Sequence, residues 1–300
     1  MGNISLYYTN ADSLGNKFNE LQALASTNNY EIICITETLP KHSINPDDIS
    51  NYTFSLSNYI GYHTLSGRGV SIYVHENLKS EAVSFDANFS DNLWVNLETS
   101  PKKYILLGCL YRSPNSSESN NESLVSMLKE SKSKNAHNRL IVGDFNLKEI
   151  DWVNFCVHTR PEHTAMKVFD VVNDLFYEQL IDEPTRHRAG ERANLLDWVL
   201  TDNSEMIENI CVGPPLGTKG DHNSIELDIV LPRCLTYSPE KLNLYKGNYA
   251  GMIKSINSVD WESKLGVMSC SQAWDSFHNF MQTCIKEHIP VFKEKLKKKK

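Results

Sequence analysis

Along the first 232 residues, short apolar runs alternate with polar segments in the pattern typical of β-strands separated by helices and loops. Residues 4–8 alternate as a strand, and residues 31–37 (EIICITE) predict a buried strand that ends on an acid, Glu37. Between these strands, apolar residues recur every three or four positions from 14 to 24, so we expect an amphipathic helix there.

The middle of the chain carries three alternating runs with no convincing helix between them: residues 69–74 (GVSIYV), 93–97 (LWVNL) and 104–110 (YILLGCL). We therefore expect an antiparallel meander in the middle of a sheet. A helix is predicted around residues 122–132, and the apolar run at 140–142 predicts the end of another buried strand.

The next segment pairs a helix with two more strands. Apolar positions within residues 165–180 predict a helix that faces the core, and residues 195–201 (LLDWVLT) and 224–230 predict strands. Asp197 lies among apolar neighbours in the first of these strands. Because an unpaired acid is expensive to bury, we expect Asp197 to have a partner.

The chain changes character after residue 232. Residues 259–289 have apolar positions at helical intervals, so we expect one or two amphipathic helices that dock on another surface, with the closing lysines solvated. We therefore predict a first domain of residues 1–232 and a helical connector with a lysine-rich tail at residues 233–300.

Composition narrows the class of protein. A chain of 300 residues, 40% hydrophobic and 22% charged, is typical of a globular protein. No run approaches the ~20 apolar residues of a membrane span, and the N-terminus lacks a signal region, so we expect an intracellular protein, nuclear or cytoplasmic, with no membrane partner. The seven cysteines are an odd number without a C-x-x-C pair, so we expect no disulfide framework and no zinc site.

The charge balance argues against indiscriminate binding to nucleic acid, because the net charge is −7. Two basic stretches depart from this average, residues 186–192 (RHRAGER) and 293–300 (KEKLKKKK). A local basic surface is therefore compatible with the composition, and the oligomeric state is left open.

The strongest chemical signal is the run LIVGDFNLKEID at residues 140–151. We expect Gly143 to let the chain turn at the end of the strand, so that Asp144 and Asn146 project side by side. A carboxylate can orient or deprotonate water while an amide N–H donates to a phosphate oxygen, which suits hydrolysis of an anionic ester. The alternative is an Asx turn, in which both side chains only satisfy loop backbone.

Polar residues at the ends of other predicted strands strengthen the hydrolytic interpretation. If the strands bring their ends to one edge of a sheet, these residues converge although they are far apart in the sequence. The set consists of Asn10, Glu37, Tyr111, Asp144, Asn146, Asp197, Asp221 and His222. Several carboxylates, amide donors and one histidine match Mg²⁺-assisted cleavage of a phosphodiester, with Mn²⁺ as a substitute ion. Taken singly, Tyr111 also fits an edge aromatic and His222 a surface histidine.

The order of these residues, N…ITE…YRSPN…GDFN…LDWVLT…DH, resembles the endonuclease/exonuclease/phosphatase superfamily, which shares the fold of deoxyribonuclease I and of apurinic endonucleases. Longer motifs resemble the endonuclease domain of non-LTR retrotransposons of the CR1 or jockey type. These motifs are ITET, GRGVSIYV, LYRSPN, VGDFNLKEIDW, and EPTR followed by NLLDWVLT. The resemblance covers residues 4–231. Residues 244–289 are similar to the connector that precedes the reverse transcriptase in those elements, and none of the polymerase's own motifs occurs here.

The resemblance implies an α/β fold, a four-layered α/β/β/α sandwich of two packed, mostly antiparallel sheets with a small helical C-terminal extension. It implies a Mg²⁺-dependent phosphodiester hydrolase, and more specifically an endonuclease that nicks one strand of DNA and leaves a 3′-hydroxyl for an attached polymerase. We expect the chain to be the front part of an element's reading frame, or a truncated or domesticated copy.

For the metal, the resemblance implies Glu37 as a ligand, with Asn10 beside it and Asp221 completing the shell. Asp12 occupies the position at which apurinic endonucleases carry a metal-linked Asp, so it joins the predicted metal set.

For catalysis, the resemblance implies that Asp144 positions or deprotonates the attacking water, while Asn146 and His222 hold the scissile phosphate. Asp197 would orient His222 through its other ring nitrogen. Tyr111 would contact the phosphate or the leaving oxygen.

For DNA, the basic loop at residues 186–192 lies where such enzymes carry a hairpin that enters a groove. We therefore assign Arg186, His187 and Arg188 to DNA contact, together with Arg112.

Two departures from the family pattern are visible. Gly220 stands where the family often has Ser before the Asp-His pair, and the glycine-rich GGGV appears as Gly67-Arg68-Gly69-Val70. Neither change touches a residue whose loss should abolish hydrolysis, so we expect an intact active site.

Two alternatives stay open. The same chemistry on a small phosphoester, such as an inositol phosphate or a sphingolipid headgroup, would make the chain a phosphatase or phosphodiesterase. A catalytically silent remnant would bind nucleic acid nonspecifically through residues 297–300, unless these lysines are translated poly(A).

Overall fold

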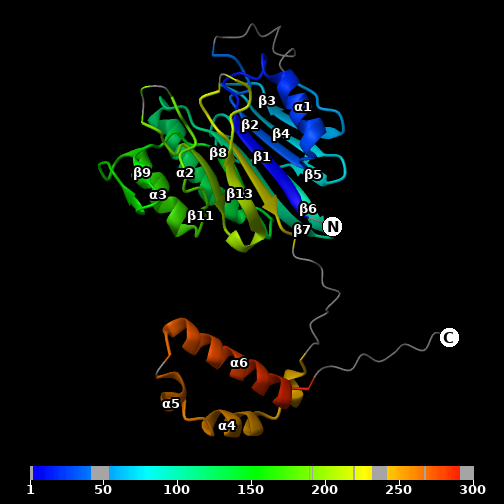
Figure 1. The fold of residues 1–300 in the computed structure, drawn as a ribbon, viewed down its shortest axis with the longest axis vertical. Coiled ribbons are helices and arrows are strands. Elements are labelled where there is room, and N and C mark those ends of the chain that lie inside the picture. Colours follow the sequence, from blue (N-terminus) through cyan, green and yellow to red (C-terminus); the bar gives the residue numbers. More distant parts are fainter. Residues whose placement is uncertain are drawn as a thin grey trace, which may run out of the picture. The chain divides into compact units, whose positions relative to one another are not determined.

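The structure is a computed structural model that describes residues 3–41, 54–231 without 189, 191 and 219, and 242–290 without 267. The chain divides into two compact units, Met1–Leu231 and Pro232–Lys300 (Figure 1). Within the described ranges, none of the helices has the length and apolar character needed to cross a membrane.

The first unit contains a six-stranded sheet in the order β13-β14-β1-β2-β4-β3. β1 and β2 run parallel, and the other neighbours in this sheet are antiparallel. Its strands are β1 (Ile4–Asn10), β2 (Ile32–Thr36), β3 (Tyr59–Thr64), β4 (Val70–His75), β13 (Ile207–Gly213) and β14 (Ser224–Ile229).

A second six-stranded sheet has the order β11-β12-β8-β7-β6-β5, with β7 and β8 parallel. Its strands are β5 (Lys79–Ala82), β6 (Asn92–Ser100), β7 (Lys103–Tyr111), β8 (Asn138–Asp144), β11 (Glu178–Gln179) and β12 (Asp197–Thr201). A short hairpin of β9 (Ile150–Asp151) and β10 (Cys156–Val157) follows β8.

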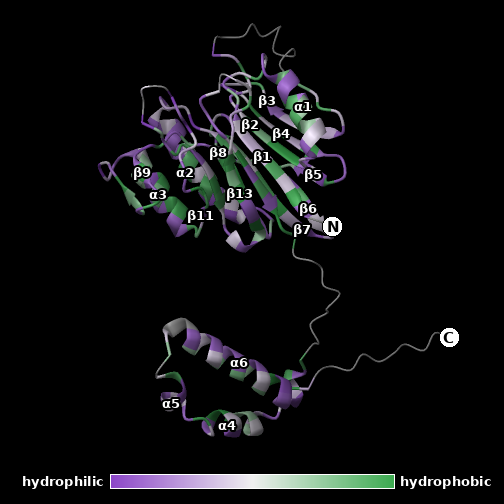
Figure 2. Ribbon diagram, viewed as in Figure 1, coloured by the Kyte–Doolittle hydropathy of each residue, from purple (hydrophilic) through white to green (hydrophobic). Residues whose placement is uncertain are grey.

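Successive side chains of a strand point to opposite faces of its sheet, and the packing of both faces produces four layers. In β2, Ile32 and Cys34 join the core between the sheets, whereas Ile33 and Ile35 pack with α1 (Phe18–Asn28) on the outer face. The outer face of the second sheet packs in the same way on α2 (Glu118–Ser133) and α3 (Thr164–Asp174). The predicted α/β/β/α sandwich is confirmed (Figure 1), and hydrophobic residues concentrate on its strands (Figure 2).

Two local predictions are wrong. The expected meander does not form, because β4 pairs with β2 and β3 in the first sheet while β6 and β7 pair in the second. Alternating runs identify strands in sequence but do not show which sheet each strand joins. The helix predicted over residues 165–180 ends at Asp174, and Phe176 then adopts a left-handed backbone (φ 54°) with its ring exposed.

The second unit is helical, as expected. Its helices are α4 (Tyr249–Asn257), α5 (Trp261–Leu265) and α6 (Cys270–His288). The indole of Trp261 packs edge-on against the ring of Phe280, and Ser255 Oγ lies 2.9 Å from Nε2 of His288, which joins α4 to α6. The lysine tail at residues 293–300 lies outside the described residues.

Candidate active site

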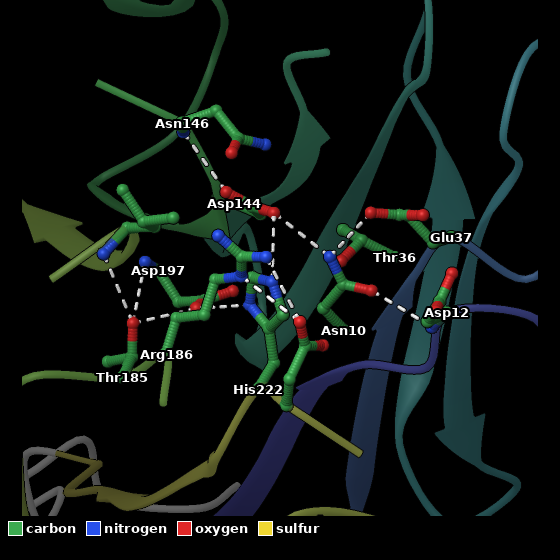
Figure 3. Close-up of polar contacts among 12 residues, drawn as sticks. Asn10, Asp12, Thr36, Glu37, Asp144, Asn146, Thr185, Arg186, Asp197 and His222 are labelled. Atoms are coloured by element: carbon green, nitrogen blue, oxygen red, sulfur yellow. Dashed lines mark hydrogen bonds and ion pairs between the residues drawn. The ribbon is translucent and has the colours of Figure 1, made fainter. Parts of the chain in front are cut away.

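One edge of the sandwich collects strand ends from both sheets. β1 and β2 are parallel and in register, so they end together, on Asn10 and just before Glu37. β7 and β8 are also parallel, and their last residues, Tyr111 and Asp144, are paired. β12 begins at Asp197, directly opposite Asp144. The predicted strand ends therefore lie at one edge (Figure 3).

Gly143 is required here for a reason other than the predicted turn. It lies within β8, and a Cβ at this position would sit 2.1 Å from the carbonyl oxygen of Leu110 on β7. The chain adopts its left-handed conformation later, at Asn146 (φ 49°), a residue type that tolerates it. Gly143 thus permits the close approach of two strands that delivers Asp144 to the edge.

His222 lies between two carboxylates that face each other across a strand pair. Its Nδ1 is 2.8 Å from Oδ2 of Asp197, and its Nε2 is 3.9 Å from Oδ2 of Asp144. Burial alone would lower the pKa of His222, but Asp197 and Asp144 outweigh it and raise the pKa to about 10. Burial, followed by the charge of Asp197, also raises the pKa of Asp144 well above its usual value. A cationic imidazole therefore offsets the repulsion between the two acids.

Asp197 is fully buried and has the partners that a buried acid requires. Its Oδ1 accepts a 2.7 Å hydrogen bond from the hydroxyl of Tyr8, and its Oδ2 accepts one of 2.7 Å from Oγ1 of Thr185. The same Thr185 oxygen accepts a 2.9 Å bond from the backbone N–H of Asp197. These bonds fix the carboxylate toward Nδ1 of His222.

Asn10 connects Asp144 to the first sheet. Its Nδ2 donates to Oε1 of Glu37 and to Oδ2 of Asp144, both at 2.9 Å. Its Oδ1 accepts a 3.0 Å bond from the backbone N–H of Asp12. Asp144 therefore lies between the His222 and Asp197 pair on one side and the Asn10 and Glu37 pair on the other (Figure 3).

Arg68 pairs with two of the predicted metal ligands. Its Nε donates to Oε2 of Glu37 at 2.9 Å, and its Nη2 donates to the same oxygen and, at 3.0 Å, to Oδ1 of Asp12. The loop is fixed because the backbone N–H groups of Arg68 and Gly69 donate to Asp91 at 2.7 and 3.0 Å. The departure from the glycine-rich family pattern thus places a guanidinium among the acids.

Some residues of this edge have left-handed backbone conformations, as do others elsewhere in the fold, such as Asn58 and Lys102. At the edge they occur at Asp12 (φ 41°), Ser13 (φ 80°), Glu37 (φ 53°) and Asn146 (φ 49°). Each costs about 1–3 kcal/mol for a residue other than glycine, and such residues cluster where a side chain must be aimed at a ligand.

Arg112 supports the loop after β8. It is 6% exposed, its Nε donates to Oδ1 of Asn121 at 2.9 Å, and its Nη1 donates to the carbonyl of Asn146 at 3.2 Å. The Nδ2 of Asn146 donates back to the carbonyl of Arg112 at 2.9 Å. The guanidinium of Arg112 thus holds the loop, and its contact with DNA stays a prediction.

Tyr111 is also buried beside the acids. Burial raises the pKa of its hydroxyl, and the charges of Glu37 and Asp144 raise it further. The phenol therefore stays protonated and can act as a hydrogen-bond donor.

The sequence predicts different roles for Asp221 and Arg186, but the structure pairs them. Nε and Nη2 of Arg186 lie 3.2 and 3.1 Å from Oδ2 of Asp221. His187 and Arg188 are exposed, and the backbone N–H of His187 donates to the carbonyl of Asp221 at 2.8 Å. An antiparallel bridge between Arg186 and His222 attaches this basic segment to the histidine.

Three residues of the site escape sequence analysis. Tyr8 lies in an apolar strand, where an aromatic residue is expected to be part of the core. Thr185 belongs to the motif EPTR that resembles the family, but nothing else in the sequence indicates a role for it. Arg68 is visible only as a departure from a glycine-rich pattern. Their importance follows from contacts with distant residues.

The donor set fits a divalent cation. Burial, and after it the charge of Asp197, raises the pKa of Asp144, and a nearby cation would favour its ionised form. Glu37, Asp12 and Asn10 offer the oxygen ligands that Mg²⁺ prefers. Ligand atoms of Asp144, Asp197 and His222 also lie within 4.8 Å of one another, but His222 itself bridges those two acids.

Comparison with known proteins agrees with this geometry. A family model described as endonuclease-reverse transcriptase matches residues 105–226. The endonuclease domain of TRAS1, a telomere-specific non-LTR retrotransposon, superposes with a TM-score of 0.57 at 17% identity, covering 76% of this chain and 99% of that one. The chain has the fold of the endonuclease/exonuclease/phosphatase superfamily. This supports the resemblance at the level of the fold.

Other solved structures share the superfamily fold. AP endonuclease LMAP from Leishmania major gives a TM-score of 0.61 at 14% identity, covering 77% of this chain and 89% of its own. TDP2 from D. rerio, complexed with single strand DNA product, gives 0.53 at 13% identity, covering 76% and 99%. No curated protein shows significant similarity to the chain. At these identities the likeness establishes the fold.

Proposed function

We propose that the chain is a Mg²⁺-dependent phosphodiester hydrolase that nicks one strand of DNA, of the type carried by non-LTR retrotransposons. The observation that carries this proposal is the buried series Asp197, His222 and Asp144, joined through Asn10 to Glu37 at one edge of the sandwich. The endonuclease-reverse transcriptase family model and the TRAS1 domain support the choice of substrate.

Asp144 would orient or deprotonate the attacking water. One of its oxygens accepts from the backbone N–H of Asn146 at 3.0 Å and the other from Asn10, so the carboxylate is anchored. His222 is cationic at neutral pH because its pKa is raised to about 10. Its positive charge is therefore in place before negative charge develops on the phosphate. A charge fixed in advance stabilises the transition state without reorganisation.

Asp197 acts on the reaction through His222. By accepting from Nδ1 it fixes the orientation of the ring, so that Nε2 faces the edge on which Asp144 lies. Tyr111, protonated because its pKa is raised, would donate to the phosphate or the leaving oxygen. The side-chain amide of Asn146 would add a second hydrogen-bond donor to the phosphate, beside the hydroxyl of Tyr111.

The metal would be held by Glu37, Asn10 and Asp12. When bound, Mg²⁺ or Mn²⁺ supplies positive charge that offsets the charge developing on the phosphate. Asp221 would join these ligands only after its ion pair with Arg186 opens. The exposed His187 and Arg188 and the neighbouring Arg186 would contact the DNA backbone, in keeping with the DNA product bound by D. rerio TDP2.

The test is nicking of supercoiled plasmid by purified protein with Mg²⁺, with and without EDTA. Asp144→Asn should abolish nicking, because the amide cannot take a proton from water. Asp170→Asn, the same chemical change on the exposed face of α3, should leave the rate unchanged. Nicking that persists in EDTA or in Asp144→Asn would disprove the mechanism. Hydrolysis of inositol phosphates without plasmid nicking would reassign the substrate.

One observation favours a second candidate, a catalytically silent remnant that binds nucleic acid. The guanidinium of Arg68 already neutralises Glu37 and Asp12, which are proposed to hold the metal. A remnant would bind DNA with equal affinity in Mg²⁺ and in EDTA and would show no nicking. Nicking by the wild-type protein excludes this candidate.

A further inference from the structure

A second group of metal-binding side chains lies on the hairpin of β9 and β10, outside the candidate active site. Asp151 on β9 is paired with Cys156 on β10, and His158 follows two residues later on the same face. The Sγ of Cys156 lies 3.7 Å from Nε2 of His158, and Oδ2 of Asp151 lies 3.7 Å from the same nitrogen. The three ligand atoms lie within 4.8 Å of one another.

This arrangement differs from a nucleophilic triad. In a Cys-His-Asp triad the thiol and the carboxylate contact opposite ring nitrogens, whereas here both approach Nε2 of His158. Tetrahedral zinc, with bonds of about 2.3 Å to sulfur and about 2.0–2.2 Å to nitrogen and oxygen, separates its ligand atoms by about 3.3–3.6 Å. The two observed separations of 3.7 Å are close to these values.

We infer that Asp151, Cys156 and His158 form a Zn²⁺ site whose fourth position is open to solvent. A thiolate and an imidazole favour Zn²⁺ over Mg²⁺, so the site would not compete for the ion of the candidate active site. On binding, the thiol of Cys156 releases its proton to solvent and its sulfur bonds to the metal, so affinity rises with pH.

The carboxylate of Asp151 is already oriented for this role. The backbone N–H and the Nδ2 of Asn154 donate to its two oxygens, each at 2.9 Å. These bonds lower the pKa of Asp151, which keeps it ionised as a ligand must be. Hydrogen bonds from a second residue commonly orient metal ligands in this way.

A cross-link here has a structural consequence. β9 and β10 contain only two residues each, and so short a hairpin is marginal without support. The hairpin leaves the loop that carries Asn146, and its turn is anchored by Trp152, whose ring packs edge-on against Trp198 at 5.1 Å. Zn²⁺ would hold the two strands together beside that loop. The sequence predicts no zinc site, because that prediction depends on a C-x-x-C pair. The spacing of this group, Asp-x4-Cys-x-His, contains none.

Cobalt titration of the full chain in excess Mg²⁺ tests the inference independently of nuclease activity. Co²⁺ bound by Cys156 should give a thiolate-to-cobalt charge-transfer band that Zn²⁺ abolishes by displacement. The Asp144, Asp197 and His222 group contains no thiol, so it cannot produce this band.

Matched variants decide the outcome. Cys156→Ala should abolish the band, and His158→Ala should weaken Co²⁺ binding by at least about 100-fold, more than the roughly 10–100-fold of a supporting residue. Cys211→Ala removes an exposed thiol on β13 and should leave the band unchanged. A band that survives Cys156→Ala, or no band in the wild-type protein at millimolar Co²⁺, overturns the inference.

Discussion

Replacing His222 with alanine should destabilise the protein strongly at neutral pH and much less in alkali. The pKa of His222 is raised to about 10 in the folded protein, from 6.5. Because the folded state holds the proton more tightly, the stabilisation is complete below pH 6.5 and is lost as the pH rises through 10. At about 1.36 kcal/mol per pH unit, it amounts to at most about 5 kcal/mol below pH 6.5, about 4 at pH 7 and about 1.4 at pH 9.

Urea unfolding at pH 7, 8, 9 and 10 in metal-free buffer measures this dependence. The quantity of interest is the difference in unfolding free energy between wild type and His222→Ala, since titrations of groups remote from His222 cancel. We expect this difference to shrink by about 2–4 kcal/mol between pH 7 and pH 10. His187→Ala, which removes an exposed imidazole, should change the free energy of unfolding by no more than about 0.5 kcal/mol at any pH.

A difference that stays constant or grows between pH 7 and pH 10 would refute the reasoning. It would mean that His222 is neutral in the folded protein and that the two acids are balanced in some other way. Proton NMR of the imidazole ring, with Asp197→Asn as the matched variant that lowers the pKa, would report the same charge directly.

Three further predictions follow from single contacts. Thr185→Val removes the 2.7 Å bond to Asp197 and should lower the free energy of unfolding by about 1–3 kcal/mol, measured by urea titration. Gly143→Ala places a Cβ 2.1 Å from a backbone carbonyl of β7 and should cost more than about 4 kcal/mol, seen as a fall in the thermal midpoint. Arg68→Ala frees Oε2 of Glu37, so the Mg²⁺ concentration for half-maximal nicking should fall by roughly 10-fold, and an unchanged concentration would show that Arg68 does not compete with the ion.

The layered fold was predictable through the family resemblance, and the edge that gathers the strand ends was predictable from the polar residues that follow the apolar runs. Alternation along a strand determines which side chains face the core, and parallel neighbours end at the same edge. Asp197 was recognisable for a similar reason, since an acid among apolar residues needs a partner. The assignment of β4 and β6 to different sheets was not predictable, because the alternation that identifies a strand does not show which sheet the strand joins.

The contacts that tune the site were beyond sequence analysis for another reason. Arg68 reaches Glu37 only because Asp91, far along the chain, holds its loop. Asp221 and Arg186 each fit a separate functional role in sequence, and only their proximity shows that they neutralise each other. Such pairings depend on three-dimensional distance, which the order of residues does not record.

The hydrogen bond from Tyr8 to Asp197 runs from the first sheet to the second. The imidazole of His222 is therefore aligned only when the two sheets have closed on each other in register. A nascent or partly unfolded copy would lack this alignment, so cutting activity would be withheld until folding is complete. If the chain is the proposed nuclease, such late maturation would limit accidental cleavage of DNA.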